Sequence, residues 1–159
     1  MRWWDKIGVR ELLAAHSGLR ISTLTDELIS IEGKVAIYAQ LPGANVIDEE
    51  FSIRIEIPAS FPKKLPKVFE TAEDFVRDPD YHTYQDGSLC LGSDIRLLQV
   101  CSENLNIFAF FEKVVVPCLY SISHKLKYGT PPYGELGHGE VGLIDDYEKL
   151  FGLEGKKAV

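Results

Sequence analysis

The change of pattern across residues 51–66 constrains the fold more than any other feature of the sequence. Apolar side chains at positions 51, 53, 55 and 57 alternate with polar ones, which is the period of a half-buried strand. Pro58, Pro62 and Pro66 then follow within nine residues. Because proline fixes φ and has no N–H to donate, this stretch cannot pair inside a sheet. We therefore interpret residues 58–66 as a rigid connection between two strands.

Further strand patterns lie on both sides of this connection. Apolar runs at residues 27–32 and 34–41 are separated by Gly33, and residues 67–71 form a shorter run. The short loops between these runs favour an antiparallel meander over alternating strands and helices. Before them, residues 3–16 carry apolar side chains loosely at helical spacing. The sequence thus predicts an α+β fold with an N-terminal helix and a four-stranded antiparallel meander.

Beyond the sheet, the chain is polar and turn-rich from residue 73 to residue 102 and then becomes apolar. The apolar run over residues 105–119 predicts a buried helix, with Ser102 as its N-cap. Pro117 is expected to kink or divide that helix, because its ring opposes a regular helical turn. A short terminal helix is expected over residues 143–151.

Length and charge limit the possible classes of protein. The chain has 159 residues and a formal net charge of −7 at pH 7, and its length suits one domain. We expect that domain over residues 1–152 and a flexible tail over residues 153–159. The acidic balance argues against direct binding of nucleic acid, whose readers are usually basic. The chain shows neither a signal peptide nor a run of ~18 apolar residues, so we expect a cytoplasmic protein that binds no membrane.

The cysteines are three in number: Cys90, Cys101 and Cys118. An odd count in a chain too large to need disulfide staples is typical of a reducing cytosol. No Cys-x-x-Cys or His-x-x-x-His spacing occurs, so we expect no metal site and no cofactor. Cys118 follows a proline within an apolar run, and we interpret it as part of the core.

The other two cysteines compete for the role of a nucleophile. Leu89 and Leu91 flank Cys90 in an extended-looking segment, so the thiol points outward if the leucines point inward. Cys101 immediately precedes Ser102, at the expected start of the buried helix. There the helix dipole would favour a thiolate. The sequence leaves both candidates open and favours Cys90.

Three features occur in an order that points to a known family: Phe51–Phe69 with its proline connection, His82, and the segment Asp86-Gly87-Ser88-Leu89-Cys90-Leu91. Over residues 27–119, this order resembles the ubiquitin-conjugating enzyme (UBC-like) family. The chain departs from the family where His-Pro-Asn becomes His82-Thr83-Tyr84, which lacks the asparagine. The spacing from His82 to Cys90 is also shorter, and the Trp-x-Pro segment after the cysteine is missing. These departures are similar to a bacterial branch, whose stand-alone members occur in short type II CBASS antiphage operons with a cGAS-like nucleotidyltransferase.

The resemblance implies a UBC-like fold with helices after an active-site loop, and a transferase activity in antiphage defence. Cys90, or its rival Cys101, would carry the C-terminus of a partner protein as a thioester and pass it to an amine or a thiol. The expected partner is a cGAS-like nucleotidyltransferase. One UBC-sized domain leaves no room for an adenylating domain, which is similar to the stand-alone type.

The resemblance also suggests roles for residues around the cysteine. The histidine equivalent to His82 is mostly structural in the family, and we favour that role over proton transfer, although an imidazole titrates near neutrality. Because the asparagine is absent, the oxyanion needs another donor. The candidates are the Tyr84 hydroxyl and the loop amides at Gly87, Ser88 or Gly92.

Two other functions stay open. A non-catalytic binding module of the same fold agrees with the missing asparagine but not with the retained Cys90. A thiol hydrolase would pair Cys90 or Cys101 with His124 or His138. It requires an imidazole within hydrogen-bond reach of the sulfur.

Overall fold

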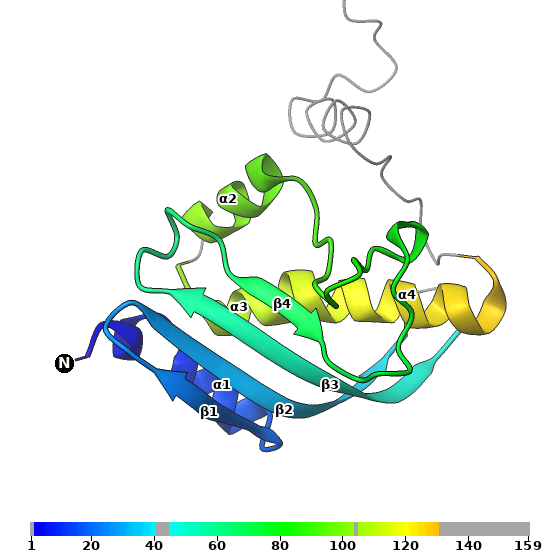
Figure 1. The fold of residues 1–159 in the computed structure, drawn as a ribbon, viewed down its shortest axis with the longest axis horizontal. Coiled ribbons are helices and arrows are strands. Elements are labelled where there is room, and N and C mark those ends of the chain that lie inside the picture. Colours follow the sequence, from blue (N-terminus) through cyan, green and yellow to red (C-terminus); the bar gives the residue numbers. More distant parts are fainter. Residues whose placement is uncertain (1, 41–44, 104, 131–159) are drawn as a thin grey trace, which may run out of the picture.

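A computed structural model describes residues 2–40, 45–103 and 105–130. The chain folds as an α+β arrangement in which an N-terminal helix precedes a four-stranded antiparallel sheet, and further helices follow it (Figure 1). The strand order in the sheet is the order in the sequence, so the predicted meander is confirmed. The helix expected over residues 143–151, the tail and His138 lie outside the described residues.

The strands are β1 (Leu19–Leu24), β2 (Leu28–Ala39), β3 (Ile47–Pro58) and β4 (Lys67–Glu70). β1 was not predicted from the sequence, and β2 was wrongly divided at Gly33. There the backbone, at φ 146°, passes so close to Gly18, just before β1, that a Cβ atom would overlap the carbonyl oxygen of Gly18. The glycine therefore permits close strand contact and does not end the strand.

The alternation predicted for β3 is present. Phe51, Ile53, Ile55 and Ile57 are at most 3% exposed, and the residues between them are partly exposed. Ile55 pairs with Ile31 on one side and with Val68 on the other. One face of the sheet is therefore a continuous apolar surface that must be covered by other elements.

The helices are η1 (Trp3–Lys6), α1 (Val9–Ala15), η2 (Pro79–Tyr81), α2 (Asp94–Glu103), α3 (Ile107–Phe110), the π-helical η3 (Phe111–Val115) and α4 (Val116–Tyr128). The single helix expected over residues 3–16 is two short helices, because Gly8 takes a left-handed conformation at φ 84° between them. α2 was not predicted from the sequence; it begins eight residues before the expected cap at Ser102.

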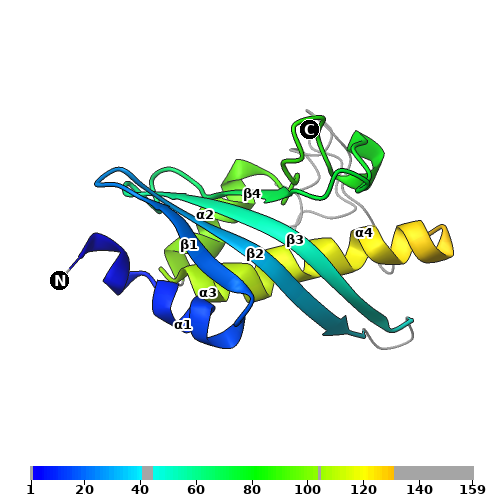
Figure 2. The same ribbon diagram turned by 60° about the horizontal axis from the view of Figure 1, so that its bottom comes forward.

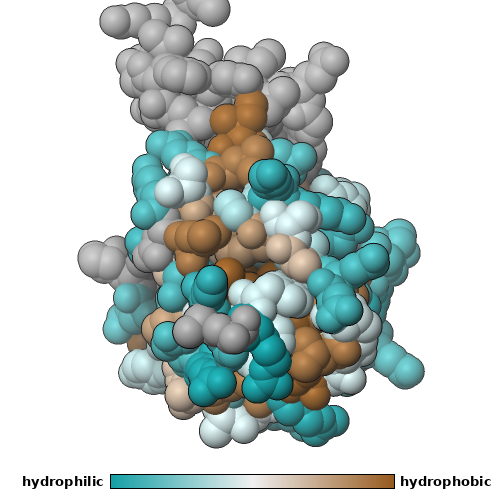
Figure 3. Space-filling model, turned by 90° about the vertical axis from the view of Figure 1, so that its left-hand side faces the viewer, coloured by the Kyte–Doolittle hydropathy of each residue, from teal (hydrophilic) through white to brown (hydrophobic). Residues whose placement is uncertain are grey.

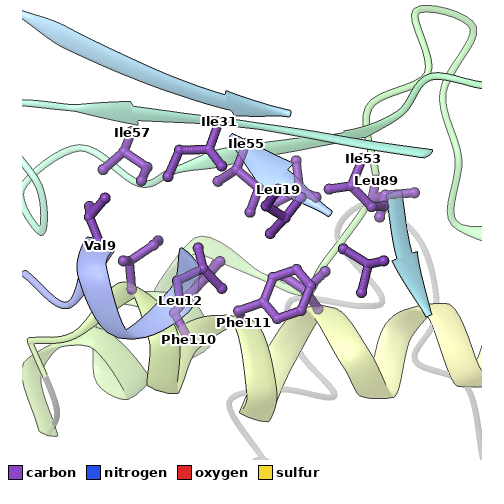
Figure 4. Close-up of a cluster of buried hydrophobic side chains, with 14 of the residues drawn as sticks. Val9, Leu12, Leu19, Ile31, Ile53, Ile55, Ile57, Leu89, Phe110 and Phe111 are labelled. Atoms are coloured by element: carbon purple, nitrogen blue, oxygen red, sulfur yellow. The ribbon is translucent and has the colours of Figure 1, made fainter. Parts of the chain in front are cut away.

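The core lies between the sheet and the helices. Figure 4 shows Ile31, Ile55 and Ile57 of the sheet facing Val9 and Leu12 of α1, with Phe110 and Phe111 closing the layer from below. All seven side chains are at most 2% exposed. Full burial of one such side chain is worth about 1.5–3 kcal/mol, so this layer holds the sheet against the helices.

Residues 107–128 form one long helical segment that runs along a face of the sheet (Figure 2). By length and composition alone this segment could cross a membrane, but half of its most apolar window is buried inside the protein. Pro117 lies in the first turn of α4 and does not end the segment. The π turn of η3 precedes it, and such a bulge is a common way to accommodate an interruption of the helical ladder.

The N-cap of this segment is Asn106, not Ser102 as predicted. The Asn106 side-chain oxygen accepts a hydrogen bond from the backbone N–H of Ala109 at 3.0 Å. Ser102 lies inside α2, where its hydroxyl donates to the carbonyl oxygen of Gln99 at 2.8 Å. The cap is thus displaced by four residues from the position that the apolar pattern suggested.

Replacing Asn106 with alanine should lower the free energy of unfolding by about 1 kcal/mol, because an N–H at the helix start loses its partner. Urea unfolding of the variant measures this loss. Ser102→Ala is the matched control and should change stability by less than about 0.5 kcal/mol, since it removes no cap. A larger loss in Ser102→Ala than in Asn106→Ala would contradict the assignment of the cap.

Apolar side chains are also exposed at the end of the molecule that lies at the left of Figure 1. Figure 3 looks onto this end and shows hydrophobic side chains gathered between polar ones. Leu24, at the end of β1, is 44% exposed, and Leu98 on α2 is 41% exposed. Single exposed leucines are ordinary on protein surfaces, so they are no sign of a site by themselves.

Candidate active site around Cys90

The segment over residues 82–90 forms a tight hairpin after β4. The Tyr84 N–H donates to the carbonyl oxygen of Ser88 at 2.9 Å, and the Gly87 N–H donates to that of Tyr84 at 2.9 Å. Gly87 has φ +86°, and a Cβ atom there would lie 2.8 Å from the backbone oxygen of Glu70. Glycine is therefore required at the turn both for its conformation and for space.

This hairpin is attached to the edge of the sheet. The Leu89 N–H donates to the carbonyl oxygen of Val68 at 2.8 Å, and the Glu70 N–H donates to that of Gly87 at 3.0 Å. Across the hairpin, the Cys90 N–H donates to the carbonyl oxygen of His82 at 2.7 Å. The rigid sheet thus fixes Cys90 beside His82, although eight positions separate them in the sequence.

Cys90 is partly exposed, whereas Leu89 before it is only 7% exposed. The expected placement, with the thiol directed away from the inward leucine, agrees with this burial pattern. The sulfur accepts hydrogen bonds from the side chains of His82 and Tyr84 and from the backbone N–H of Gly92. The His82 hydrogen bond has the largest effect on the pKa of the Cys90 thiol. Together the donors lower this pKa from its ordinary value, although burial acts in the opposite direction.

His82 contributes both its backbone and its side chain to this site. The residue takes a left-handed conformation, with φ 56°, at the end of η2. Its carbonyl oxygen holds the Cys90 backbone, which is the structural role favoured by the sequence analysis. The imidazole also hydrogen-bonds to the thiol, so the role of His82 is not limited to holding the loop.

Tyr84 is 47% exposed. Its hydroxyl hydrogen-bonds to Cys90, and this contact, together with the charge that Cys90 carries as a thiolate, raises the pKa of Tyr84 to about 12. The phenol therefore keeps its proton at any pH near neutrality and acts as a donor.

Of the three loop amides proposed as oxyanion donors, two donate to acceptors within the turn and the third donates to the sulfur. The Gly87 N–H is used within the turn, and the Ser88 N–H donates to Asp86 Oδ1 at 2.9 Å. The Ser88 hydroxyl donates to the same oxygen at 2.6 Å. The Gly92 N–H, by contrast, donates to the Cys90 sulfur. The structure therefore leaves Tyr84 and Gly92, and not Gly87 or Ser88, as donors next to the thiol.

Cys101 does not lie at a helix start, and that expectation was wrong. It is near the C-terminal end of α2, where the helix dipole disfavours negative charge. The residue is 1% exposed, and burial raises the pKa of its thiol. Both effects oppose reactivity, so the argument that supported Cys101 as a rival nucleophile is removed.

Cys118 lies on α4 and packs against the hydrophobic core, as the sequence analysis expected. The residue retains some exposed surface, but its thiol is densely enclosed. Burial, and to a smaller extent the negative charge of Cys90, raises the pKa of the Cys118 thiol to about 12. A thiol of this kind is inert near neutral pH.

The other described histidines have partners of their own away from this sulfur. His124 is 5% exposed, and its Nδ1 hydrogen-bonds to the carbonyl oxygen of Thr130 at 2.7 Å. His16 pairs with Glu112 through Nε2 at 2.8 Å. Among the described histidines, His82 is the one that meets the Cys90 sulfur, whereas His124, one of the two histidines of the hydrolase alternative, bonds elsewhere.

Glu70, at the end of β4, contacts the hairpin through its backbone and was not predicted from the sequence. Its two carboxylate oxygens accept the backbone N–H groups of Ser52 and Ala72, at 3.1 and 2.6 Å. The residue is 2% exposed, and burial raises the pKa of its carboxyl group. A signal existed in the sequence, because Glu70 lies two positions after the buried Val68, on the same face of a strand.

Lys125 of α4 anchors the opposite side of the loop. Its Nζ donates to the carbonyl oxygen of Asp80 at 2.6 Å and lies 4.8 Å from the ring centre of Tyr81. The loop before His82 is thereby attached to α4, while the loop after it is attached to β4. The thiol and its donors are held between these two fixed supports.

The arrangement is suited to nucleophilic chemistry by a thiolate. No cluster of three or more metal-binding side chains is found among the described residues. Comparison of the chain with protein-family models, curated proteins and solved structures finds no match.

Proposed function

We propose that this chain is a ubiquitin-conjugating-like transferase that carries an acyl group as a thioester on Cys90. The single observation that carries the proposal is a partly exposed thiol that accepts hydrogen bonds from His82, Tyr84 and Gly92, which lower its pKa. The order of the elements, an N-terminal helix, a four-stranded meander and later helices, is consistent with the UBC-like fold that we propose for it.

The chemistry requires an acyl donor that is already activated. The Cys90 thiolate attacks the carbonyl carbon of an incoming thioester, a C–S bond forms, and the C–S bond to the donor breaks. The departing thiolate takes a proton from water. In the second step an amine nitrogen or a thiolate attacks the same carbon, and Cys90 leaves as a thiolate; an attacking amine gives up one proton to water. The low pKa of Cys90 favours both its attack and its departure.

We further propose a cargo and a setting, on the resemblance of the sequence alone. The cargo is the C-terminus of a partner protein, a cGAS-like nucleotidyltransferase, and the setting is antiphage defence in the bacterial cytoplasm. The acidic net charge agrees with a link to nucleotides that runs through this partner and not through direct binding.

A synthetic thioester of the partner's C-terminal peptide tests the proposal without the activating enzyme. On a non-reducing gel, the protein should gain the mass of the peptide, and an added thiol should remove it. Cys90→Ala should abolish the adduct, while Cys101→Ala should retain it. An adduct that is lost only in Cys101→Ala, or retained in both variants, would overturn the assignment of Cys90.

A thiol hydrolase is the second candidate, and the contact between His82 and Cys90 favours it. A cysteine and a histidine within hydrogen-bond reach are the machinery of such enzymes. The two functions differ in the fate of the acyl group. A transferase keeps the thioester in water and releases it to an added amine, whereas a hydrolase releases it to water at the same rate with or without the amine.

A further inference from the structure

Tyr84 combines a fixed backbone with a partly exposed side chain whose hydroxyl meets the Cys90 sulfur. Its N–H and its carbonyl oxygen are both held within the hairpin, each at 2.9 Å from its partner. The side chain is 47% exposed, yet its hydroxyl reaches the Cys90 sulfur. Because Thr83 pairs with Leu89 across the hairpin, Tyr84 and Cys90 lie on the same face of it, and the hydroxyl is next to the atom that attacks an acyl group.

The other donors near the sulfur are less able to donate a hydrogen bond to the oxygen of an incoming acyl group. The Gly92 N–H belongs to the backbone, so it cannot move toward a new acceptor by side-chain rotation. The N–H groups of Gly87 and Ser88 are engaged within the turn. Tyr84 can move its hydroxyl by side-chain rotation alone, while its backbone stays in place.

The atom that requires hydrogen-bond donors changes during the reaction. While Cys90 is a thiolate, its sulfur needs donors. When the sulfur attacks, the C–S bond forms, and the electron pair of the carbonyl π bond moves to oxygen, so the charge passes from sulfur to that oxygen. A donor that no longer has the thiolate as its acceptor can then donate its hydrogen bond to that oxygen. The high pKa of Tyr84 ensures that the phenol still holds its proton at this moment.

We propose that Tyr84 is a catalytic residue whose hydroxyl donates a hydrogen bond to the oxyanion, both when Cys90 is acylated and when it is released. This inference rests on the proposed thioester function and concerns the acylation and deacylation of Cys90 at the same site. Removal of one oxyanion donor lowers the rate by about 10²–10³-fold in a well-studied hydrolase.

Two reactions of Cys90 separate this role from simple stabilisation of the thiolate. Acylation by p-nitrophenyl acetate passes through a tetrahedral oxyanion, whereas alkylation by iodoacetamide does not. Both begin with the same thiolate. Tyr84→Phe removes the hydroxyl and keeps the ring. Tyr38→Phe is the matched control, because Tyr38 is 74% exposed on β2 and lies outside the hairpin.

In Tyr84→Phe, the rate of acylation should fall about 10²-fold, while alkylation falls by no more than about tenfold. Release of the acetyl group from Cys90 to added hydroxylamine should slow by a factor similar to that for acylation. Tyr38→Phe should match the wild type in all three reactions. An equal loss of acylation and alkylation, or no loss of either, would overturn the assignment, and circular dichroism confirms that the variant is folded.

The outcomes also distinguish this inference from the proposed function. If the partner's peptide thioester never loads Cys90, but Tyr84→Phe selectively slows acylation by the small ester, the proposed cargo is wrong and the role of Tyr84 stands. If the peptide loads Cys90, but the ratio of acylation to alkylation is unchanged in Tyr84→Phe, the transferase stands and the role of Tyr84 is wrong.

Discussion

Replacing His82 with asparagine should slow alkylation of Cys90 by iodoacetamide at pH 7 on the order of tenfold or more. The variant removes the hydrogen bond that contributes most to lowering the pKa of the thiol. A hydrogen bond to a charged group is worth about 1.5–3 kcal/mol, and about 1.4 kcal/mol corresponds to tenfold. Asparagine is chosen because it tolerates the left-handed conformation at this position.

The direction of the pKa shift predicts how the alkylation rate of His82→Asn depends on pH. A lowered thiol pKa means that the thiolate of the wild type persists to lower pH than that of an ordinary cysteine. The loss in His82→Asn should therefore be largest at neutral pH and should disappear only about two pH units above the ordinary thiol pKa of ~8.5, where both thiols are ionised. His16→Asn is the control, since His16 pairs with Glu112 and does not meet the sulfur. A loss that persists unchanged at high pH would point to a distorted loop.

Replacing Glu70 with glutamine should lower the free energy of unfolding by about 2–3 kcal/mol. The carboxylate accepts two backbone N–H groups, from Ser52 and Ala72, in a buried position. Glutamine offers only one oxygen and directs an NH₂ group at the other N–H. A buried donor without a partner costs about 1–3 kcal/mol, and more where a charged group is involved. Urea unfolding measures the loss, and Glu27→Gln, at an exposed position, should cost less than about 0.5 kcal/mol.

Glu70 should also make the free energy of unfolding depend on pH. Burial raises its pKa in the folded protein, so the folded state holds this proton more tightly than the unfolded state. The contribution of Glu70 therefore falls as pH rises through the interval between its ordinary and its raised pKa. The difference in unfolding free energy between the wild type and Glu70→Gln should shrink as pH rises through that interval. A difference that grows instead would contradict the raised pKa.

The fold was predictable from the sequence where periodicity alone decides the structure. The alternation over residues 51–57 is decided by which face of β3 is buried, and the prolines after it exclude sheet pairing. Gly33 misled the prediction because a glycine that ends a strand and one that admits a neighbouring backbone look the same in one dimension. Gly18 lies just before β1 and approaches β2 from a distant part of the sequence, and no local pattern contains this contact.

The start of the apolar helix after residue 105 was misplaced for a different reason. Ser102 and Asn106 are both good cap residues, and the apolar run after them did not decide which one begins the helix. The decision depends on α2, whose mixed composition does not suggest a helix strongly. This one displacement was enough to misplace Cys101 at a helix N-terminus and to make it a false rival of Cys90.

The candidate site was predictable as a set of residues but not as a geometry. The sequence placed Cys90, His82, Tyr84 and Gly92 in one polar segment. It could not show that the hairpin brings an imidazole and a phenol to the same sulfur. It also missed Glu70, whose position on an inward face was visible but whose partners lie 18 and two residues away.

The most direct test of the central claim is to locate the acyl group after the protein reacts with the partner's peptide thioester. Acid quenching, protease digestion and mass spectrometry assign the adduct to one of the three cysteines. We predict that the acyl group is found on Cys90, with Cys101 and Cys118 unmodified, in keeping with the directions of their thiol pKa shifts. An acyl group on Cys101, or one spread over all three thiols, would contradict the account.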